Sequence, residues 1–421
     1  MRILLVGASG FIGRHLLRAL HAEGLSLVAT SRSGQGSAWP GVEWRALDLA
    51  LLATDAAHFR WPPDIDLLIN ATGVLSTDPD QLSAVQDQGA RALFDLAAAH
   101  GARVIQLSAL GAGDQPDVPF LASKSLADKH LLDLNVPAVV LRPSLVLGEG
   151  GASSGWLSRM SPWPLIPVLS TRVRMQPLHV DDLVAAVLGL LRRWPERSCV
   201  LPLVGPQAMT LPQLLDQLRA AQGWAPARCL QVPAPLAGLG ARLGDRFGWR
   251  ALNTQTLSLA RRDNLADTGA MKTAIGFAAA PLASRLSEWP RPDHSVTAAL
   301  RPLLLAVLVL IWLGTAVVCL GPGHDWGLRI MAEVGVHGWM ATAAVAGGAL
   351  VDGLLGIGLL LRRWRRHALR AQLALMLGYM LIISLWLPHY WLDPFAAVAK
   401  NAVLLVATLW LLWTEPQERR R

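Results

Sequence analysis

The chain has 421 residues, of which 52% are hydrophobic and 16% charged, and its mean hydropathy is +0.37. It is too long for one ordinary domain and too apolar for an average soluble protein. A net charge of +8 suits either a nucleic acid or a membrane surface. Five arginines crowd into residues 362–370 between apolar runs, so we expect a membrane-lipid partner and no nucleic acid.

A glycine-rich turn follows the first predicted strand. Residues 3–6 are apolar, three glycines follow at intervals of three, and an amphipathic helix is predicted to about Glu23. Such glycines permit a tight turn, close approach to a pyrophosphate and close helix–strand packing. The helix N-terminus offers N–H groups to phosphates. A turn without a ligand is the alternative, but we predict a dinucleotide site comprising Gly7, Ser9, Gly10, Phe11, Ile12 and Gly13.

The end of the second predicted strand, residues 25–30, bears on the choice of nucleotide. In this kind of fold an acidic residue there binds a ribose 2′-hydroxyl, whereas an arginine accommodates a 2′-phosphate. The chain has Ser31 and Arg32 at this point and no carboxylate. We therefore expect NADP(H) rather than NAD(H), with an ordinary solvated Arg32 as the alternative.

Strands and helices alternate through the rest of this half. Apolar strands are predicted at residues 42–47, 65–70, 104–107 and 136–141, with helices at 81–100 and 120–134. This pattern is typical of an α/β fold with a doubly wound parallel sheet covered on both faces, the Rossmann type. Ligands of such sheets bind at the carboxyl ends of the strands, so we expect the residues that follow the strands to converge. They are Gly7, Arg32, Asp48, Thr72, Ser108 and Pro143.

Several motifs, in order along the chain, resemble the extended or atypical short-chain dehydrogenase/reductases. They are the glycine motif, Asp48-Leu49, Asn70-Ala71-Thr72-Gly73, Ser108, Phe120-x-x-x-Lys124, residues 178–184 and residues 203–207. The resemblance covers residues 1–290. It implies that the glycines bind pyrophosphate, that Asp48 and Leu49 lie by the adenine and that Ala71, Thr72 and Gly73 border the cofactor. It further implies two catalytic residues, Lys124, which binds the nicotinamide ribose, and Ser108, which orients a substrate carbonyl.

One position departs from this family. Its general acid is a tyrosine four residues before the lysine, and here that position is Phe120, which has no O–H to donate. The two tyrosines of the chain, Tyr379 and Tyr390, lie in its apolar C-terminal part. Ser123, Ser125, His130 or a water molecule are the alternative donors. Cofactor binding is thus better supported than ordinary ketone–alcohol chemistry.

Residues 143–290 correspond to the substrate region of that family. Residues 148–155 are predicted to form a flexible loop, and Trp156, Met160 and Trp163 favour either an apolar pocket or plain core packing. Asp181 or Asp182 is predicted to cap a helix rather than bind a metal. Helices are also predicted at 211–221, 234–247 and 252–262, and residues 291–301 are a linker. The three cysteines form no metal-type pair, and we expect no metal site.

Four apolar runs follow, at about residues 302–320, 340–361, 371–387 and 395–413, each close to the length that crosses a bilayer. Basic residues precede the first run, separate the second from the third, and end the chain in the tail 416–421. These segments lie on one side of a four-helix bundle, so we expect a multi-pass protein of the inner, cytoplasmic membrane with both termini in the cytoplasm. Asp352 and Lys400 fall within spans, and an interior pair is one interpretation; a snorkelling Lys400 is the other.

Residues 302–415 resemble the DoxX-like four-span membrane family, most closely at residues 392–401. Two functions remain open. One is a membrane-anchored NADP(H)-dependent oxidoreductase that acts on an apolar or quinone-related substrate. The other is a protein that binds NADP(H) without turnover, as a structural or redox-sensing element, similar to NmrA-like sensors and the nucleotide-binding accessory subunit of respiratory complex I. The fold alone does not choose between them.

Overall fold

The computed structural model describes residues 1–37, 39–74, 76, 78–248, 253–286, 291–392, 394 and 396–415. The chain forms two compact units, Met1–Ser295 and Val296–Arg421, and each is described by itself. The predicted tail 416–421 lies outside the described residues, as do residues 287–290 at the end of the predicted first domain.

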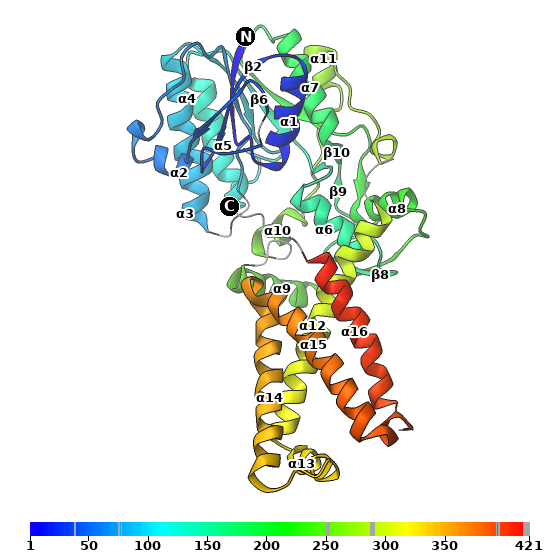
Figure 1. The fold of residues 1–421 in the computed structure, drawn as a ribbon. Coiled ribbons are helices and arrows are strands. Elements are labelled where there is room, and N and C mark those ends of the chain that lie inside the picture. Colours follow the sequence, from blue (N-terminus) through cyan, green and yellow to red (C-terminus); the bar gives the residue numbers. More distant parts are fainter. Residues whose placement is uncertain are drawn as a thin grey trace. The chain divides into compact units, whose positions relative to one another are not determined.

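The first unit is built on a seven-stranded sheet in the order β11-β6-β5-β4-β1-β2-β3 (Figure 1). Every neighbouring pair in this sheet is parallel. The strand order reverses between β1 and β4, which is the point where dinucleotides bind in open α/β sheets. The predicted doubly wound Rossmann-type fold is therefore confirmed. The strands are β1 (Arg2–Val6), β2 (Ser26–Ser31), β3 (Val42–Ala46), β4 (Leu67–Asn70), β5 (Arg103–Leu107), β6 (Ala138–Pro143) and β11 (Cys199–Leu203).

Helices cover both faces of the sheet because successive side chains of a strand point to opposite sides. Ile3 and Leu5 pack under α1 (Phe11–Ala22), α7 (Val180–Arg192) and α11 (Ala270–Ile275). Leu4 and Val6 pack on the other side, under α2 (Leu49–Leu52), α4 (Gly89–Ala99) and α5 (Pro119–Asp133). Figure 1 shows α1, α7 and α11 on one side of the sheet and α2, α4 and α5 on the other. This two-sided core explains why the strands read as continuous apolar runs.

The predicted helix 81–100 is in fact three segments. The helix α3 (Pro79–Leu82) leads into a π-helical turn, η2 (Ser83–Gln88), and then into α4. A Cβ on Gly89 would lie 2.1 Å from the carbonyl oxygen of Leu49, so this helix is held tightly against α2. The sequence pattern did not distinguish this π-helical turn from an α-helix, so a single helix was predicted.

The substrate region contains more regular structure than predicted. The predicted loop 148–155 is helical from Ala152 onward. The prediction that Asp181 or Asp182 caps the next helix is wrong. The N-cap of α7 is His179, whose ring nitrogen accepts a hydrogen bond from the amide of Asp181 at 3.3 Å. Asp182 instead pairs with Arg285 at 2.6 Å. The remaining elements are β7 (Val146–Leu147), α6 (Ala152–Met160), β8 (Leu165–Val168), β9 (Arg174–Met175), β10 (Leu178–His179), β12 (Met209–Thr210), α8 (Leu211–Ala221), β13 (Arg228–Gln231), α9 (Ala234–Phe247), α10 (Thr254–Leu259) and η3 (Leu282–Arg285).

The second unit is helical. Its described part has three helices long and apolar enough to cross a membrane, α12 (Pro292–Leu320), α14 (Gly338–Leu360) and α15 (Arg362–Trp386), and a shorter apolar helix, α16 (Ala397–Thr414). The predicted linker 291–301 is helical from Pro292 onward, as part of α12. The segments α13 (His324–Glu333) and η4 (Pro388–Leu392) were not predicted.

Among the residues described in the second unit, some charged side chains form ion pairs, whereas Asp352 and Lys400 do not pair with each other. Glu415 pairs with Arg301 of α12 and, at 3.5 Å, with Arg365 of α15, so one carboxylate connects three helices. Asp352 is buried on α14, whereas Lys400 on α16 is exposed. No ion pair joins Asp352 to Lys400 in the described part of the chain, so the structure does not support the interior pair.

Candidate nucleotide-binding site

The glycine turn between β1 and α1 is shaped by close backbone contacts. Gly7 has a φ of +80°, a conformation that side chains other than glycine rarely adopt. A Cβ on Gly13 would lie 2.1 Å from the carbonyl oxygen of Gly7, so a larger residue cannot fit. The amide of Gly10 donates to that same oxygen at 2.9 Å. The turn therefore requires glycine at positions 7 and 13.

The start of α1 has the features of an anion site. Gly10 is the N-cap and provides no side-chain cap, and the first turn contains no acidic residue. The first amides of a helix have no intrahelical acceptor, and the helix dipole adds partial positive charge there. Ser9, Phe11, Ile12 and Gly13 lie around this N-terminus. These residues fit the pyrophosphate of a dinucleotide, which would supply acceptors to the free amides.

Ser31 and Arg32 lie at the carboxyl end of β2, next to the glycine turn. The amide of Ala8 donates to the carbonyl oxygen of Thr30 at 3.2 Å, which ties this strand end to the turn. Ser31 is buried, and its hydroxyl donates to the carbonyl oxygen of Gln35 at 2.7 Å. Arg32 is exposed and makes no ion pair with any residue that the structure describes. The edge of the site therefore has an uncompensated guanidinium.

Asp48 and Leu49 follow β3. Asp48 caps α2, because its Oδ1 accepts from the amide of Ala50 at 3.0 Å. Leu49 is buried in the core on the α2 side of the sheet. Asp48 thus has a structural role that is independent of a nucleotide, and its place at a strand end is the one expected for a residue beside the adenine.

Residues 71–73 follow β4 and are ordered by a buried amide network. Asn70 donates to Oε1 of Gln106 at 2.8 Å, and its own Oδ1 accepts from the hydroxyl of Thr72 at 2.6 Å. The backbone of Ala71 lies 3.0 Å from the place of a Cβ on Gly7. A Cβ on Gly73 would lie 3.8 Å from Nζ of Lys124. This segment therefore joins the glycine turn to the lysine.

Lys124 lies on α5 and is only 4% exposed. Its Nζ donates to the carbonyl oxygen of Leu107 at 3.0 Å and to that of Thr72 at 3.4 Å. Burial lowers the pKa of Lys124 to about 8, and the nearby carboxylate of Asp128 opposes this shift. The ring of Phe120 has its centroid 5.9 Å from Nζ. At neutral pH the lysine is thus a cation that releases its proton more readily than an exposed lysine.

Ser108 belongs to a second buried group. Its hydroxyl donates to Oδ2 of Asp128 at 2.6 Å, and Arg142 donates to the same oxygen at 3.1 Å and 3.2 Å. Burial raises the pKa of Asp128, against the hydrogen bond from Ser108 and the charge of Arg142. The hydroxyl hydrogen of Ser108 is therefore engaged by Asp128, and a substrate carbonyl would compete with that carboxylate for it.

Sequence reasoning missed Asp128, Arg142 and Gln86. Asp128 follows Lys124 by four residues, one helical turn, so its spacing could have revealed it. Gln86 lies in the π-helical turn η2, its buried Oε1 has no partner among the described residues, and this atom is 3.9 Å from the place of a Cβ on Gly73. No signal in the sequence marks that turn. The unpartnered oxygen faces the segment where the nicotinamide ribose is expected.

The alternative proton donors are arranged differently. The hydroxyl of Ser123 donates to the carbonyl oxygen of Phe120 at 3.1 Å. His130 lies near the end of α5 and contacts Oδ1 of Asp95 on α4 at 2.8 Å. This contact is typical of a partly exposed histidine on a helix surface and does not indicate a catalytic role. Within the described ranges, no group of three or more His, Cys, Asp or Glu side chains could hold a metal ion.

Two of the three residues predicted either to line an apolar pocket or to pack in the core are partly buried and pack against the core. Trp156 and Met160 lie against the buried cluster that contains Leu147 and Leu157. Trp163 is partly exposed. The structure thus gives Trp156 and Met160 the core-packing role that was the alternative.

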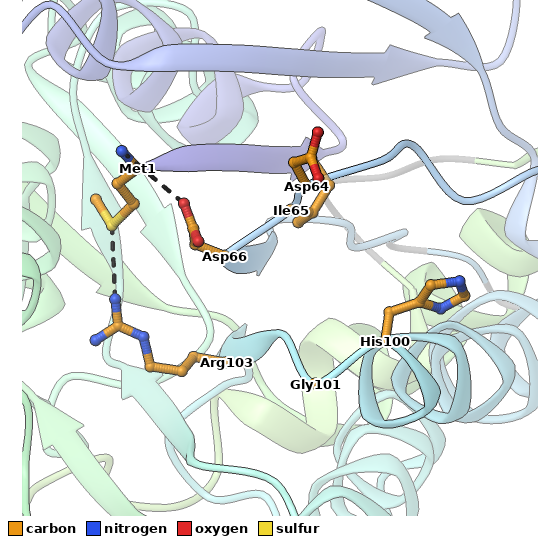
Figure 2. Close-up of a pocket in the computed structure, with 7 residues that line it drawn as sticks. All are labelled: Met1, Asp64, Ile65, Asp66, His100, Gly101 and Arg103. Atoms are coloured by element: carbon orange, nitrogen blue, oxygen red, sulfur yellow. Dashed lines mark hydrogen bonds and ion pairs between the residues drawn. The ribbon is translucent and has the colours of Figure 1, made fainter.

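A separate depression of the first unit lies at the opposite, amino-terminal edge of the sheet. It is lined by residues at the amino ends of β1, β4 and β5, among them Asp64, Asp66 and Arg103 (Figure 2), and has a volume of about 670 Å³. Arg103 contacts the sulfur of Met1 at 3.6 Å across it. Because cofactors of such sheets bind at the carboxyl ends of the strands, this depression is not the nucleotide site.

These features define a Rossmann domain that binds a nicotinamide nucleotide. Residues 3–198 match the NAD dependent epimerase/dehydratase family, and residues 309–409 match the DoxX-like family. The chain thus combines a domain that matches the NAD dependent epimerase/dehydratase family with a second domain that matches the DoxX-like family, and the sequence motifs predicted both.

Curated relatives match the nucleotide-binding part. A ceramide reductase from Caulobacter vibrioides is 29% identical over 196 residues, which are 45% of this chain and 61% of that protein. The mitochondrial NADH dehydrogenase [ubiquinone] 1 alpha subcomplex subunit 9 from Dictyostelium discoideum is 25% identical over 225 residues, 50% of this chain and 61% of that protein. The chain thus spans about three fifths of the length of these relatives.

Solved structures agree on the fold. MoeE5 in complex with UDP-glucuronic acid and NAD aligns with a TM-score of 0.54 and 18% identity, over 71% of this chain and 100% of its own. UDP-glucose 4-epimerase from Thermotoga maritima with UDP-glucose aligns with a TM-score of 0.51 and 17% identity, over 68% and 96%. At these identities the likeness establishes the fold alone.

Proposed function

We propose that this protein is a membrane-anchored, NADP(H)-dependent reductase of an apolar carbonyl substrate. The observation that carries the proposal is Lys124, a buried ammonium with a lowered pKa that borders the same strand ends as the glycine turn. Binding a nucleotide would use the charge of this lysine but would not require its lowered pKa. Perturbed pKa values of this kind cluster at functional sites.

Arg32 favours NADP(H) over NAD(H). This arginine follows β2, is exposed, and has no acidic partner among the described residues. A 2′-phosphate would neutralise it, whereas a 2′-hydroxyl would leave it unpaired. We assign the remaining cofactor contacts to the glycine turn, Asp48, Leu49, residues 71–73 and Lys124.

The proton for the reduction must come from the chain or from water. Bound NADPH would be the source of the hydride for such a reduction, and the carbonyl oxygen of the substrate would then need one proton. Phe120 cannot provide it, and the hydroxyl of Ser108 donates to Asp128. We assign the proton to the ammonium of Lys124, since an acid with a pKa of about 8 is well matched to neutral pH. Ser108 is assigned to orient the carbonyl once its bond to Asp128 is exchanged.

The membrane domain and one relative both favour an apolar substrate. A chain with several apolar helices is confined to a bilayer, where apolar molecules are concentrated. The relative from Caulobacter vibrioides is named a ceramide reductase, which associates this type of domain with a lipid. We therefore infer a long-chain ketone or a quinone-related molecule. We place the protein in the cytoplasmic membrane with its nucleotide domain and both termini inside, because the basic segments lie on that side.

A second function is favoured by Phe120. The chain lacks the acid of its family, and relatives in two organisms are subunits of NADH dehydrogenase. On this alternative the first unit binds NADP(H) without turnover, as a structural or redox-sensing element. The domain would then need the glycine turn and Arg32, but the lowered pKa of Lys124 would serve no chemistry.

The test measures NADPH oxidation by the full chain in detergent or nanodiscs, with a panel of long-chain ketones and a short-chain ubiquinone analogue. We expect turnover by the wild type, and its loss in Lys124→Met with nucleotide affinity kept within about tenfold. Phe120→Tyr restores the acid of the family. If this variant oxidises NADPH with some substrate and the wild type does so with none, the reductase proposal fails and the binding function is favoured.

A further inference from the structure

Helix α9 of the first unit buries its small residues and exposes its large ones. Ala237 and Ala241 are buried, whereas Leu236, Leu239 and Leu243 are 60%, 57% and 41% exposed. A helix on a water-soluble surface normally does the reverse, because burying leucine removes most apolar area from water. The exposed leucines are three and four residues apart, so they form one stripe along the helix.

Basic residues flank this stripe. Arg242 and Arg246 are exposed, lie one turn apart on the same flank, and form no ion pair with any described residue. The acidic residue of the helix, Asp245, is turned to the protein, where its Oδ1 accepts from the amide of Thr254 at 3.2 Å. An apolar stripe with arginines beside it is the pattern of a helix that lies in a membrane interface, with leucines toward the acyl chains and guanidinium groups at the phosphates.

The rest of the chain indicates that this surface contacts a lipid bilayer. Among its described residues the second unit has three helices long and apolar enough to cross a membrane, so the first unit is tethered to a bilayer by its own chain. The tether keeps a lipid surface at high effective concentration, which lowers the affinity that the helix needs. The two arginines select an anionic surface.

We propose that α9 lies in the membrane–water interface, with Leu236, Leu239 and Leu243 inserted among lipid chains and Arg242 and Arg246 at anionic headgroups. This docking does not depend on the nucleotide site. Because α9 belongs to the substrate region, it would also bring that region to the bilayer, and this consequence rests on the proposed function.

The test places a nitroxide at Leu239→Cys in full-length protein whose native cysteines, Cys199, Cys229 and Cys319, are replaced by serine. The protein is reconstituted in nanodiscs with about one third phosphatidylglycerol. The matched control is Leu126→Cys on α5, where the leucine is 49% exposed. We expect the label at 239 to be more accessible to oxygen than to a water-soluble nickel chelate, and the label at 126 to show the reverse.

Equal access of the nickel chelate to both labels would overturn the proposal. So would spin–spin broadening at 239 that disappears on dilution with unlabelled chains, since a second copy would then cover the stripe. Replacing Arg242 and Arg246 by Gln should lower the oxygen-to-nickel ratio at 239 at least twofold, whereas Arg18→Gln with Arg60→Gln, two exposed arginines of the same unit, should not. NADPH binding by every variant serves as the check on folding, so failure here is distinguishable from failure of the proposed reductase.

Discussion

The hydroxyl of Ser108 donates a 2.6 Å hydrogen bond to Oδ2 of Asp128, an oxygen that also accepts from Arg142. The other carboxylate oxygen of Asp128 is buried and has no partner among the described residues. This group links β5, α5 and β6 beneath the strand ends. It is the structural support of the site, and its members have consequences for stability that can be measured.

Removing the cation of this group should be costly. Arg142→Met removes the guanidinium that is hydrogen-bonded to the buried carboxylate of Asp128, and we expect a loss of about 3–5 kcal/mol in the free energy of unfolding. Ser108→Ala removes one hydrogen bond and should cost about 1–3 kcal/mol. Thermal unfolding of the full chain in detergent measures both. The double variant Asp128→Asn with Arg142→Met should recover much of the loss; no recovery would show that Arg142 acts through other contacts.

The glycine turn should not tolerate a methyl group. We expect Gly13→Ala to lower NADPH affinity at least a hundredfold, because its Cβ would lie 2.1 Å from the carbonyl oxygen of Gly7 and would displace the turn. The matched control is Gly155→Ala in α6, where a Cβ meets nothing within 4 Å. Isothermal calorimetry with NADPH compares the two variants. Wild-type affinity in Gly13→Ala would contradict the assigned phosphate site.

Arg32 should determine the choice of nucleotide. We expect Arg32→Ala to weaken NADPH at least tenfold and to leave NADH within threefold, since only the former has a 2′-phosphate. Arg18→Ala, which removes an exposed arginine from α1, is the control for net charge. Titration of each variant with both nucleotides gives the ratio of dissociation constants. An unchanged ratio in Arg32→Ala would indicate an ordinary surface arginine.

Lys124 should make the stability of the protein rise with pH in the alkaline range. Its pKa is about 8 when folded and near 10.5 when unfolded, so between these values the unfolded chain binds more protons and stability rises with pH. Below pH 8 the penalty for burying the ammonium is constant, on the order of 3 kcal/mol. Lys124→Met has no such penalty. We expect its advantage in melting temperature over the wild type to be largest at pH 7 and to shrink towards pH 10; a constant difference would contradict the lowered pKa.

Glu415 should stabilise the helical bundle. Glu415→Gln leaves Arg301 and Arg365 without their shared carboxylate, and we expect a loss of about 2–4 kcal/mol. The control is Glu333→Gln, because Glu333 is exposed and contacts the exposed His389, so its loss should cost under about 1 kcal/mol. Thermal unfolding in detergent compares them. Equal effects would show that α12, α15 and α16 do not depend on this cluster.

The sequence by itself determined the architecture. Continuous apolar strands alternating with helices can bury both faces of a sheet only in a parallel α/β fold, and glycines at intervals of three after the first strand mark the phosphate turn. Four apolar runs with basic residues between them likewise predicted the membrane domain. These features are local or periodic, so they can be recognised from the sequence without coordinates. The absence of the family's tyrosine hydroxyl at position 120 was also evident from the sequence, because it depends only on the identity of Phe120.

Tertiary structure decided what lies around each group. That Ser108 donates to Asp128, that Lys124 is enclosed by the carbonyl groups of Leu107 and Thr72, and that Gln86 is carried by a π-helical turn all depend on contacts between segments distant in sequence. So does α9, whose predicted range was right but whose exposed face is set by what packs against its alanines. Burial and pairing depend on which residues are neighbours in space, and they determine the pKa of a lysine or the exposure of a leucine. The spacing of residues along the chain does not contain this information.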